Sequence, residues 1–138
     1  MLEIPKTPGA APAGQLPLRV FLVEDFPPVR ELIVENIEEI AGLELAGMAE
    51  GEQEALDWLS KNSCDVLILD LELRQGNGLG VLKALEPANG IVKIVYSNHV
   101  SPNIRGLAER FGASHFFDKT LDTPKLRGLL ESLSVRPH

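Results

Sequence analysis

Residues 65–82 read DVLILDLELRQGNGLGVL, a short apolar run that ends in Asp70 and is followed by a glycine-rich turn. An apolar run of this length between polar residues is typical of a strand that is buried on both faces, so 65–69 is predicted to be a strand. After the turn, Val81, Leu82 and Leu85 recur at the spacing of one helical face, which predicts a helix over 78–86. The stretch therefore has the strand–loop–helix order of a βα unit.

The same alternation of short apolar runs and longer segments of helical period extends outward from this unit in both directions. Further strands are predicted at 18–23, 43–48, 91–96 and 114–117, and further helices at 28–41, 52–61, 101–111 and 123–134. In the helix at 28–41, for example, Ile33, Ile37 and Ile40 share one face. Strands that alternate with helices form a parallel sheet, so we predict an α/β fold: a flavodoxin-like (βα)5 doubly wound sheet with strand order 2-1-3-4-5.

The length and composition of the chain indicate one globular domain. The chain has 138 residues, 44% of them hydrophobic, which is enough for a single core without disulfide or metal support. Pro, Ala and Gly fill nine of the first 17 positions, a composition that buries little apolar surface. We therefore predict a flexible tail at 1–17 and one domain at 18–138.

The charge, the hydrophobic runs and the cysteine content argue against several classes of protein. A net charge of −7 opposes direct binding to nucleic acid, because the phosphate backbone attracts Lys and Arg. No apolar run has the length of a signal peptide or a membrane span. Cys64 is the only cysteine, so an internal disulfide is impossible. We expect a cytoplasmic protein without nucleic-acid or membrane partners.

Polar side chains follow four of the predicted strands where each strand ends. Glu24 and Asp25 follow the first strand, Asp70 the third, Ser97 the fourth and Lys119 the fifth. In a doubly wound sheet the carboxyl ends of the strands form the ligand-binding edge, so these groups are expected to converge. Clustered carboxylates repel one another unless a cation is bound, and oxygen ligands from few residues suit Mg²⁺. Zinc is disfavoured because one Cys and three scattered His offer no tetrahedral set.

Four motifs occur in order at these strand ends. They are VED at 23–25, the stretch around Asp70 quoted above, VYSNH at 95–99 and FFDK at 116–119. Together they resemble the receiver domain of bacterial two-component response regulators, and the resemblance covers about residues 18–136. It implies that Asp70 accepts a phosphoryl group from a phosphohistidine donor, either a sensor histidine kinase or a histidine phosphotransfer protein.

The resemblance also implies how the site would work. Mg²⁺ would be held by Glu24, Asp25 and Asp70 and by the backbone carbonyl of Glu72. Together with Lys119, this ion would neutralise the charge of the transferred group, as phosphoryl transfer requires. The chain would then be a phosphoacceptor that assists its own phosphorylation and dephosphorylation rather than an enzyme.

Signalling would depend on a conformational switch. The Ser97 hydroxyl would hydrogen-bond the phosphoryl group and draw its loop inward, and the ring of Phe116 would turn into the space vacated. The face at 101–134 would present this change to a downstream protein. Only one helix is expected after Lys119, so the sequence fits either a stand-alone receiver or part of a longer regulator.

Three positions depart from the usual pattern of the family. Arg74 stands four residues after Asp70, where Pro is common, and Thr120 follows Lys119, where Pro is also frequent. A cis peptide bond before a non-proline residue costs about 2.5–4 kcal/mol, so we expect a trans bond before Thr120. Phe116 stands where Tyr is common and lacks its hydroxyl. The departures at Arg74 and Thr120 keep an alternative open, a pseudo-receiver that binds proteins without phosphotransfer.

Two other classes fit the sequence less well. A phosphatase of the haloacid dehalogenase type needs an Asp two residues after its nucleophile on an early strand, whereas here Glu72 follows a third strand. A flavodoxin-like cofactor binder needs a phosphate-cradling loop after the first strand, where this chain has two acids. Gly76, Gly78 and Gly80 lack the spacing of a dinucleotide fingerprint and are interpreted as a source of backbone flexibility.

Overall fold

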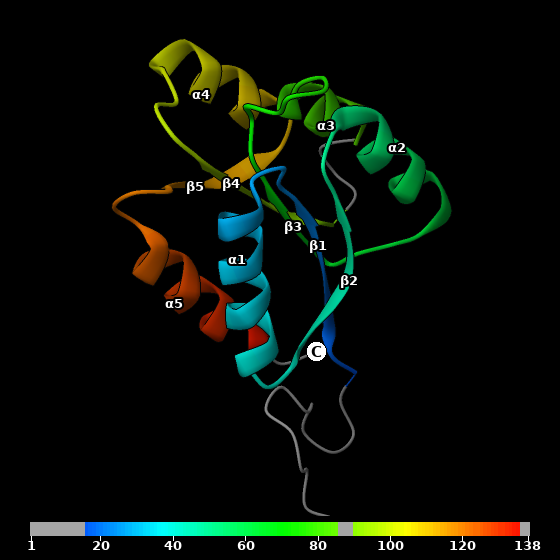
Figure 1. Cartoon of the computed structure of the whole chain (residues 1–138), viewed down its shortest axis with the longest axis vertical. Coiled ribbons are helices and arrows are strands. Elements are labelled where there is room, and N and C mark those ends of the chain that lie inside the picture. The colour runs from blue at the N-terminus through cyan, green and yellow to red at the C-terminus, as the bar shows by residue number, and fades with distance from the viewer. Residues whose placement is uncertain (1–15, 86–89, 136–138) are drawn as a thin grey trace, which may run out of the picture.

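The computed structural model describes residues 16–85 and 90–135, in which five strands alternate with five helices (Figure 1). In chain order these are β1 (Leu18–Val23), α1 (Pro27–Glu39), β2 (Leu43–Ala49), α2 (Glu52–Lys61), β3 (Val66–Leu69), α3 (Gly78–Ala84), β4 (Val92–Ser97), α4 (Pro102–Arg110), β5 (Ala113–Asp118) and α5 (Thr123–Ser134). The tail predicted at 1–17 lies outside the described residues except for Leu16 and Pro17, which belong to no helix or strand.

The strands form one sheet in the order β2-β1-β3-β4-β5, and each neighbouring pair is parallel. This confirms the predicted flavodoxin-like order. Since β1 lies between β2 and β3, the chain crosses over after β2 to reach the other side of β1. Because all the strands are parallel, the carboxyl ends of β1, β3, β4 and β5 lie along the same edge of the sheet.

Successive strand residues point to opposite sides of the sheet, and the residues on both sides are buried under helices. In β1, Val20 and Leu22 pack into one apolar cluster, and Phe21 and Val23 into another. The first cluster contains α1 and α5 residues (Ile33, Ile37, Leu126 and Leu130), and the second contains residues of α2, α3 and α4 (Ala55, Val81, Leu82 and Ala108). Helices α1 and α5 therefore cover one face, and α2, α3 and α4 cover the other (Figure 1).

Several boundaries differ from the predicted ones by one or two residues. Helix α1 ends at Glu39 rather than at 41, because Ile40 is already extended and Gly42, with a φ of 91°, turns the chain into β2. Helix α3 ends at Ala84 rather than at 86, since Leu85 is extended. Among the described residues, no helix is both long enough and apolar enough to cross a membrane.

Candidate functional site

The polar groups predicted to converge lie together at the carboxyl edge of the sheet. The register aligns Val23 with Leu69 and Leu69 with Val95, so the residues that follow β1 and β3 and the end of β4 face one another. Glu24, Asp70 and Ser97 are all buried, with 1%, 5% and 2% of their surface exposed. Buried polar groups need partners, and each of these has one inside the site.

Both carboxylate oxygens of Asp70 are held by hydrogen bonds. The hydroxyl of Ser97 donates to Oδ1 at 2.6 Å, and the backbone N–H of Glu72 donates to the same oxygen at 3.0 Å. Lys119 Nζ donates to Oδ2 at 2.7 Å. The Asp70 carboxylate is therefore oriented from three sides by groups from β4, the loop after β3 and the loop after β5.

Lys119 bridges the two buried acids. Its Nζ lies 2.8 Å from Glu24 Oε1 and 2.7 Å from Asp70 Oδ2. Burial acts to lower the pKa of Lys119, but the hydrogen bonds and charges of Asp70 and Glu24 outweigh it and raise that pKa above its ordinary value. Burial raises the pKa of Glu24, although Lys119 and the N–H of Phe26 act in the opposite direction. The ammonium group thus stays charged and compensates two carboxylates.

The acidic cluster has the donor set of a site for a hard cation. Glu24, Asp25 and Asp70 each offer one carboxylate oxygen, and these oxygens lie within 4.8 Å of one another. Three carboxylates with one face partly open to solvent match the preference of Mg²⁺ for a few protein oxygens plus water and phosphate. The cluster could therefore hold such an ion. Glu72, the fourth predicted ligand, starts the adjacent loop, where its N–H binds Asp70.

Arg74 and Thr120, which stand where the family often has proline, each donate a backbone hydrogen bond to a carboxylate. The backbone N–H of Arg74 donates to Asp25 Oδ2 at 2.7 Å, and the N–H of Thr120 donates to Asp118 Oδ1 at 2.7 Å. Proline has no N–H, so neither bond could form in a chain with proline at these positions. The described residues contain no cis peptide bond, so the bond before Thr120 is trans, as expected.

Asp118 does not join the site, although it directly precedes Lys119. Its carboxylate accepts hydrogen bonds from the backbone of Thr120 and Leu121 and so closes the turn after β5. This is the ordinary capping role of an aspartate at the end of a strand.

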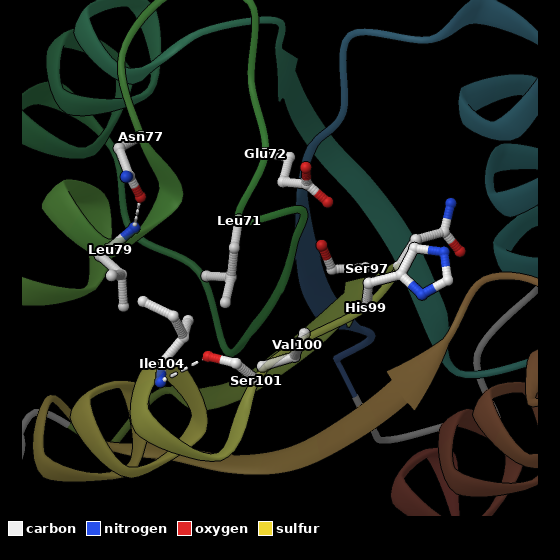
Figure 2. A pocket seen from close by; sticks show the side chains of 10 residues that line it. Leu71, Glu72, Asn77, Leu79, Ser97, His99, Val100, Ser101 and Ile104 are labelled. Atoms are coloured by element: carbon white, nitrogen blue, oxygen red, sulfur yellow. Dashed lines mark hydrogen bonds between the residues drawn. The ribbon is translucent and has the colours of Figure 1, made fainter.

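A cavity of about 250 Å³ opens beside the phosphoacceptor candidate (Figure 2). Glu72 lies on one side of it, and Ser97 at the end of β4 and His99, two residues further along the chain, lie on another (Figure 2). Apolar side chains of α3 and α4, Leu79 and Ile104, complete the wall. His99 has a φ of 52°, the only positive φ outside glycine in the part of the chain that is described, so the loop after Ser97 is held in a rarely adopted conformation.

Phe116 lies half-buried on the other side of this loop. The guanidinium carbon of Arg105 lies 4.4 Å from the centre of its ring. A second cavity, of about 230 Å³, is lined by Ser97, Val100 and Phe116 among others. The structure therefore has open space between the end of β4 and the Phe116 ring.

The glycines after β3 do not serve as sources of flexibility. A Cβ atom added at Gly78 would overlap the backbone oxygen of Asp70, and one added at Gly76 or Gly80 would overlap the side chain of Glu52. Glycine is required here for close approach. Sequence reasoning missed Glu52 because nothing local links a residue at the start of α2 with a loop more than 20 positions further along.

Comparison with known proteins adds an independent observation. The family model described as "Response regulator receiver domain" matches residues 20–131. A protein-glutamate methylesterase/protein-glutamine glutaminase of Rhodospirillum centenum is 31% identical over 118 residues, which are 83% of this chain and 30% of that protein. The transcriptional regulatory protein MalR of Bacillus subtilis is 29% identical over 114 residues, 82% of this chain and 48% of that protein. The chain thus spans less than half the length of either relative.

Solved structures share the fold at lower sequence identity. The response regulator domain of Thermotoga maritima CheB superposes with a TM-score of 0.74 at 23% identity, covering 88% of this chain and 99% of that one. The receiver domain of the putative response regulator NarL of Mycobacterium tuberculosis superposes with a TM-score of 0.76 at 22% identity, covering 87% and 98%.

Proposed function

Because this chain belongs to the response regulator receiver domain family, we propose that it accepts a phosphoryl group on Asp70 from a histidine kinase or a histidine phosphotransfer protein. The observation that carries the proposal is the Asp70 carboxylate, buried and held between the Ser97 hydroxyl and the Lys119 ammonium group. Attack on a phosphoryl group requires an oriented nucleophile and a nearby positive charge that neutralises the transferred group, and Asp70 and Lys119 offer these two features.

In the proposed reaction, a carboxylate oxygen of Asp70 forms a bond to phosphorus as the bond between phosphorus and the donor imidazole breaks. Lys119 and Ser97 then stabilise the oxygens of the transferred group by a charge and a hydrogen bond. Mg²⁺, held by Glu24, Asp25, Asp70 and the backbone carbonyl of Glu72, would supply the remaining positive charge. Water would later remove the phosphoryl group within the same site, so the chain assists both steps but converts no separate substrate.

The test is the intact mass of the protein after incubation with acetyl phosphate, with and without Mg²⁺. The proposal predicts a gain of one phosphoryl group that depends on the metal. The alternative, a pseudo-receiver that only binds proteins, predicts no gain under either condition.

Metal binding is expected to depend on Asp25. The variant Asp25→Ala loses one of three clustered carboxylates, so its affinity for Mn²⁺, measured by water proton relaxation, should fall at least about tenfold. Asp57→Ala is a suitable control, because it removes the same charge from the exposed face of α2. Equal affinity in Asp25→Ala and the control would contradict the metal role of Asp25.

We also propose that Ser97 and Phe116 form the switch and that a downstream protein reads it on the face at 101–134. Three observations support this: the Ser97 hydroxyl already contacts Asp70, a cavity lies between Ser97 and Phe116, and Arg105 of α4 stacks on the Phe116 ring. Movement of the Ser97 loop toward a phosphoryl group would enlarge the space next to the ring. The partners we propose are proteins, and the net charge of −7 opposes direct contact with nucleic acid.

Beryllofluoride, which imitates a phosphoryl group, gives a direct test of the switch. With Mg²⁺ present, chemical shifts should change in the pocket and also at Phe116 and in α4. In Ser97→Ala the pocket should still respond while the changes in α4 largely disappear, and Phe116→Tyr should enlarge them because the outward ring gains a hydrogen-bonding hydroxyl. Changes confined to the pocket of the parent protein would exclude the proposed switch.

A further inference from the structure

Glu52, the first residue of α2, is attached to the loop between β3 and α3 by two hydrogen bonds. Its backbone N–H donates to the carbonyl of Gln75 at 3.0 Å, and its carboxylate Oε1 accepts from the backbone N–H of Asn77 at 2.8 Å. The two bonds run in opposite directions, so Glu52 fixes both the position and the orientation of the loop. Its carboxylate also lies in the first turn of a helix, where the helix dipole favours a negative charge.

Two glycines provide the space that this contact needs. A Cβ atom at Gly76 would overlap the Glu52 Cβ, and one at Gly80 would overlap the Glu52 carboxylate. Gly76 also has a φ of 80°, which side chains other than glycine rarely adopt. The loop, α3 and Glu52 therefore fit together as one packed unit, with no room for a further atom at either position.

The same loop carries groups of the candidate site. Asn77 pairs with Glu72 through an antiparallel bridge, and Glu72 donates its N–H to Asp70. Between them, the N–H of Arg74 donates to Asp25. A series of contacts through the loop backbone therefore links the Glu52 carboxylate with the backbone of Glu72 and with the carboxylates of Asp25 and Asp70.

We propose that Glu52 is a positioning residue of the phosphoacceptor site: its carboxylate holds the loop that orients Asp25, Asp70 and the backbone of Glu72 for a divalent cation. The proposal rests on the proposed function for the identity of the reaction, but its contacts can be tested with metal alone. Groups that orient metal ligands typically contribute about 10–100-fold to metal affinity.

The test compares Glu52→Ala, Glu52→Gln and Glu54→Ala by titration with Mn²⁺, followed by water proton relaxation. Glu52→Ala should weaken Mn²⁺ binding about tenfold and speed hydrogen exchange at the Asn77 amide. Glu52→Gln keeps an oxygen that accepts from Asn77 and should restore both values. Glu54→Ala removes the same charge from the same helical turn, where this carboxylate accepts from Glu50 instead, and should match the parent.

A second variant tests the contact from the opposite side. Gly80→Ala leaves every carboxylate in place and puts a better helix former inside α3, but its methyl group displaces the Glu52 carboxylate. Gly80→Ala should weaken Mn²⁺ binding about tenfold, the loss expected for Glu52→Ala. It therefore tests the contact even if Glu52→Ala does not fold. Parent-like Mn²⁺ affinity in folded Glu52→Ala or in Gly80→Ala, or an equal loss in Glu54→Ala, would overturn the proposal.

The two proposals fail in different ways. If the parent takes no phosphoryl group from acetyl phosphate but Glu52→Ala still weakens Mn²⁺ binding, the proposed function is wrong and the positioning role stands. If the parent is phosphorylated and the Glu52 variants bind Mn²⁺ like the parent, the positioning role is wrong and the function stands.

Discussion

Asp70→Asn is expected to abolish phosphorylation by acetyl phosphate completely and to leave the fold intact. Asparagine has nearly the same shape, and its carbonyl oxygen can still accept from Ser97 and from the N–H of Glu72. Its NH2 group, however, is not a nucleophile and cannot accept from Lys119. Lys119 keeps its contact with Glu24, so we expect a loss of stability of only about 1–2 kcal/mol.

A matched control for this variant is Asp118→Asn. Asp118 is the last residue of β5, and both backbone N–H groups that it binds donate to one oxygen, which an asparagine carbonyl can replace. Intact mass should therefore show normal labelling of Asp118→Asn and none of Asp70→Asn. Labelling of Asp70→Asn at the parent level would assign the phosphoryl group to another residue.

Lys119→Met is expected to produce the largest loss of stability. Methionine has a similar length but leaves Glu24 and Asp70, which are 1% and 5% exposed, facing each other without a compensating cation. Removing one member of a buried, hydrogen-bonded ion pair typically costs about 3–5 kcal/mol, mostly because the remaining charge stays buried without a partner. Urea unfolding without divalent metal should show a loss near the lower end of this range, about 3 kcal/mol, since the Lys119 side chain is 12% exposed and the site is therefore not fully buried.

Lys125→Met is the control, because Lys125 is 74% exposed and its pair with Asp122 is 3.6 Å long. Exposed pairs of this kind contribute little to stability, so this variant should unfold like the parent. Addition of Mg²⁺ should restore part of the stability of Lys119→Met, because a cation that binds only the folded state stabilises it. Equal unfolding of the two lysine variants would show that Lys119 does not compensate the buried acids.

Most of the fold could be predicted because burial on both sides of a sheet produces a pattern that is local in sequence. The strand at 18–23 and the helices at 52–61 and 123–134 have the predicted bounds, since their apolar residues recur with the period of the element. The ends of α1 and α3 were less predictable. Each is set where one residue, Ile40 or Leu85, becomes extended to meet the next part of the chain.

The polar residues at the strand ends were also predictable as a group, because parallel strands bring their carboxyl ends to one edge. Their order along the chain was enough to bring Glu24, Asp70 and Ser97 together. Nothing in that order distinguishes Lys119, which enters the site, from Asp118, which closes a turn. The difference depends on which way each side chain points at the end of β5, because consecutive strand residues point to opposite faces of the sheet.

Contacts between distant segments were decided only by the tertiary structure. Lys119 lies 95 positions from Glu24, Arg74 lies 49 positions from Asp25, and Asn77 lies 25 positions from Glu52. In the last two contacts the donor is a backbone N–H, which every residue except proline carries and which leaves no trace in the sequence. The amino-acid pattern therefore determined the strands, the helices and the types of group at the site. The packing of the loops determined which oxygen of each carboxylate is held, and by which donor.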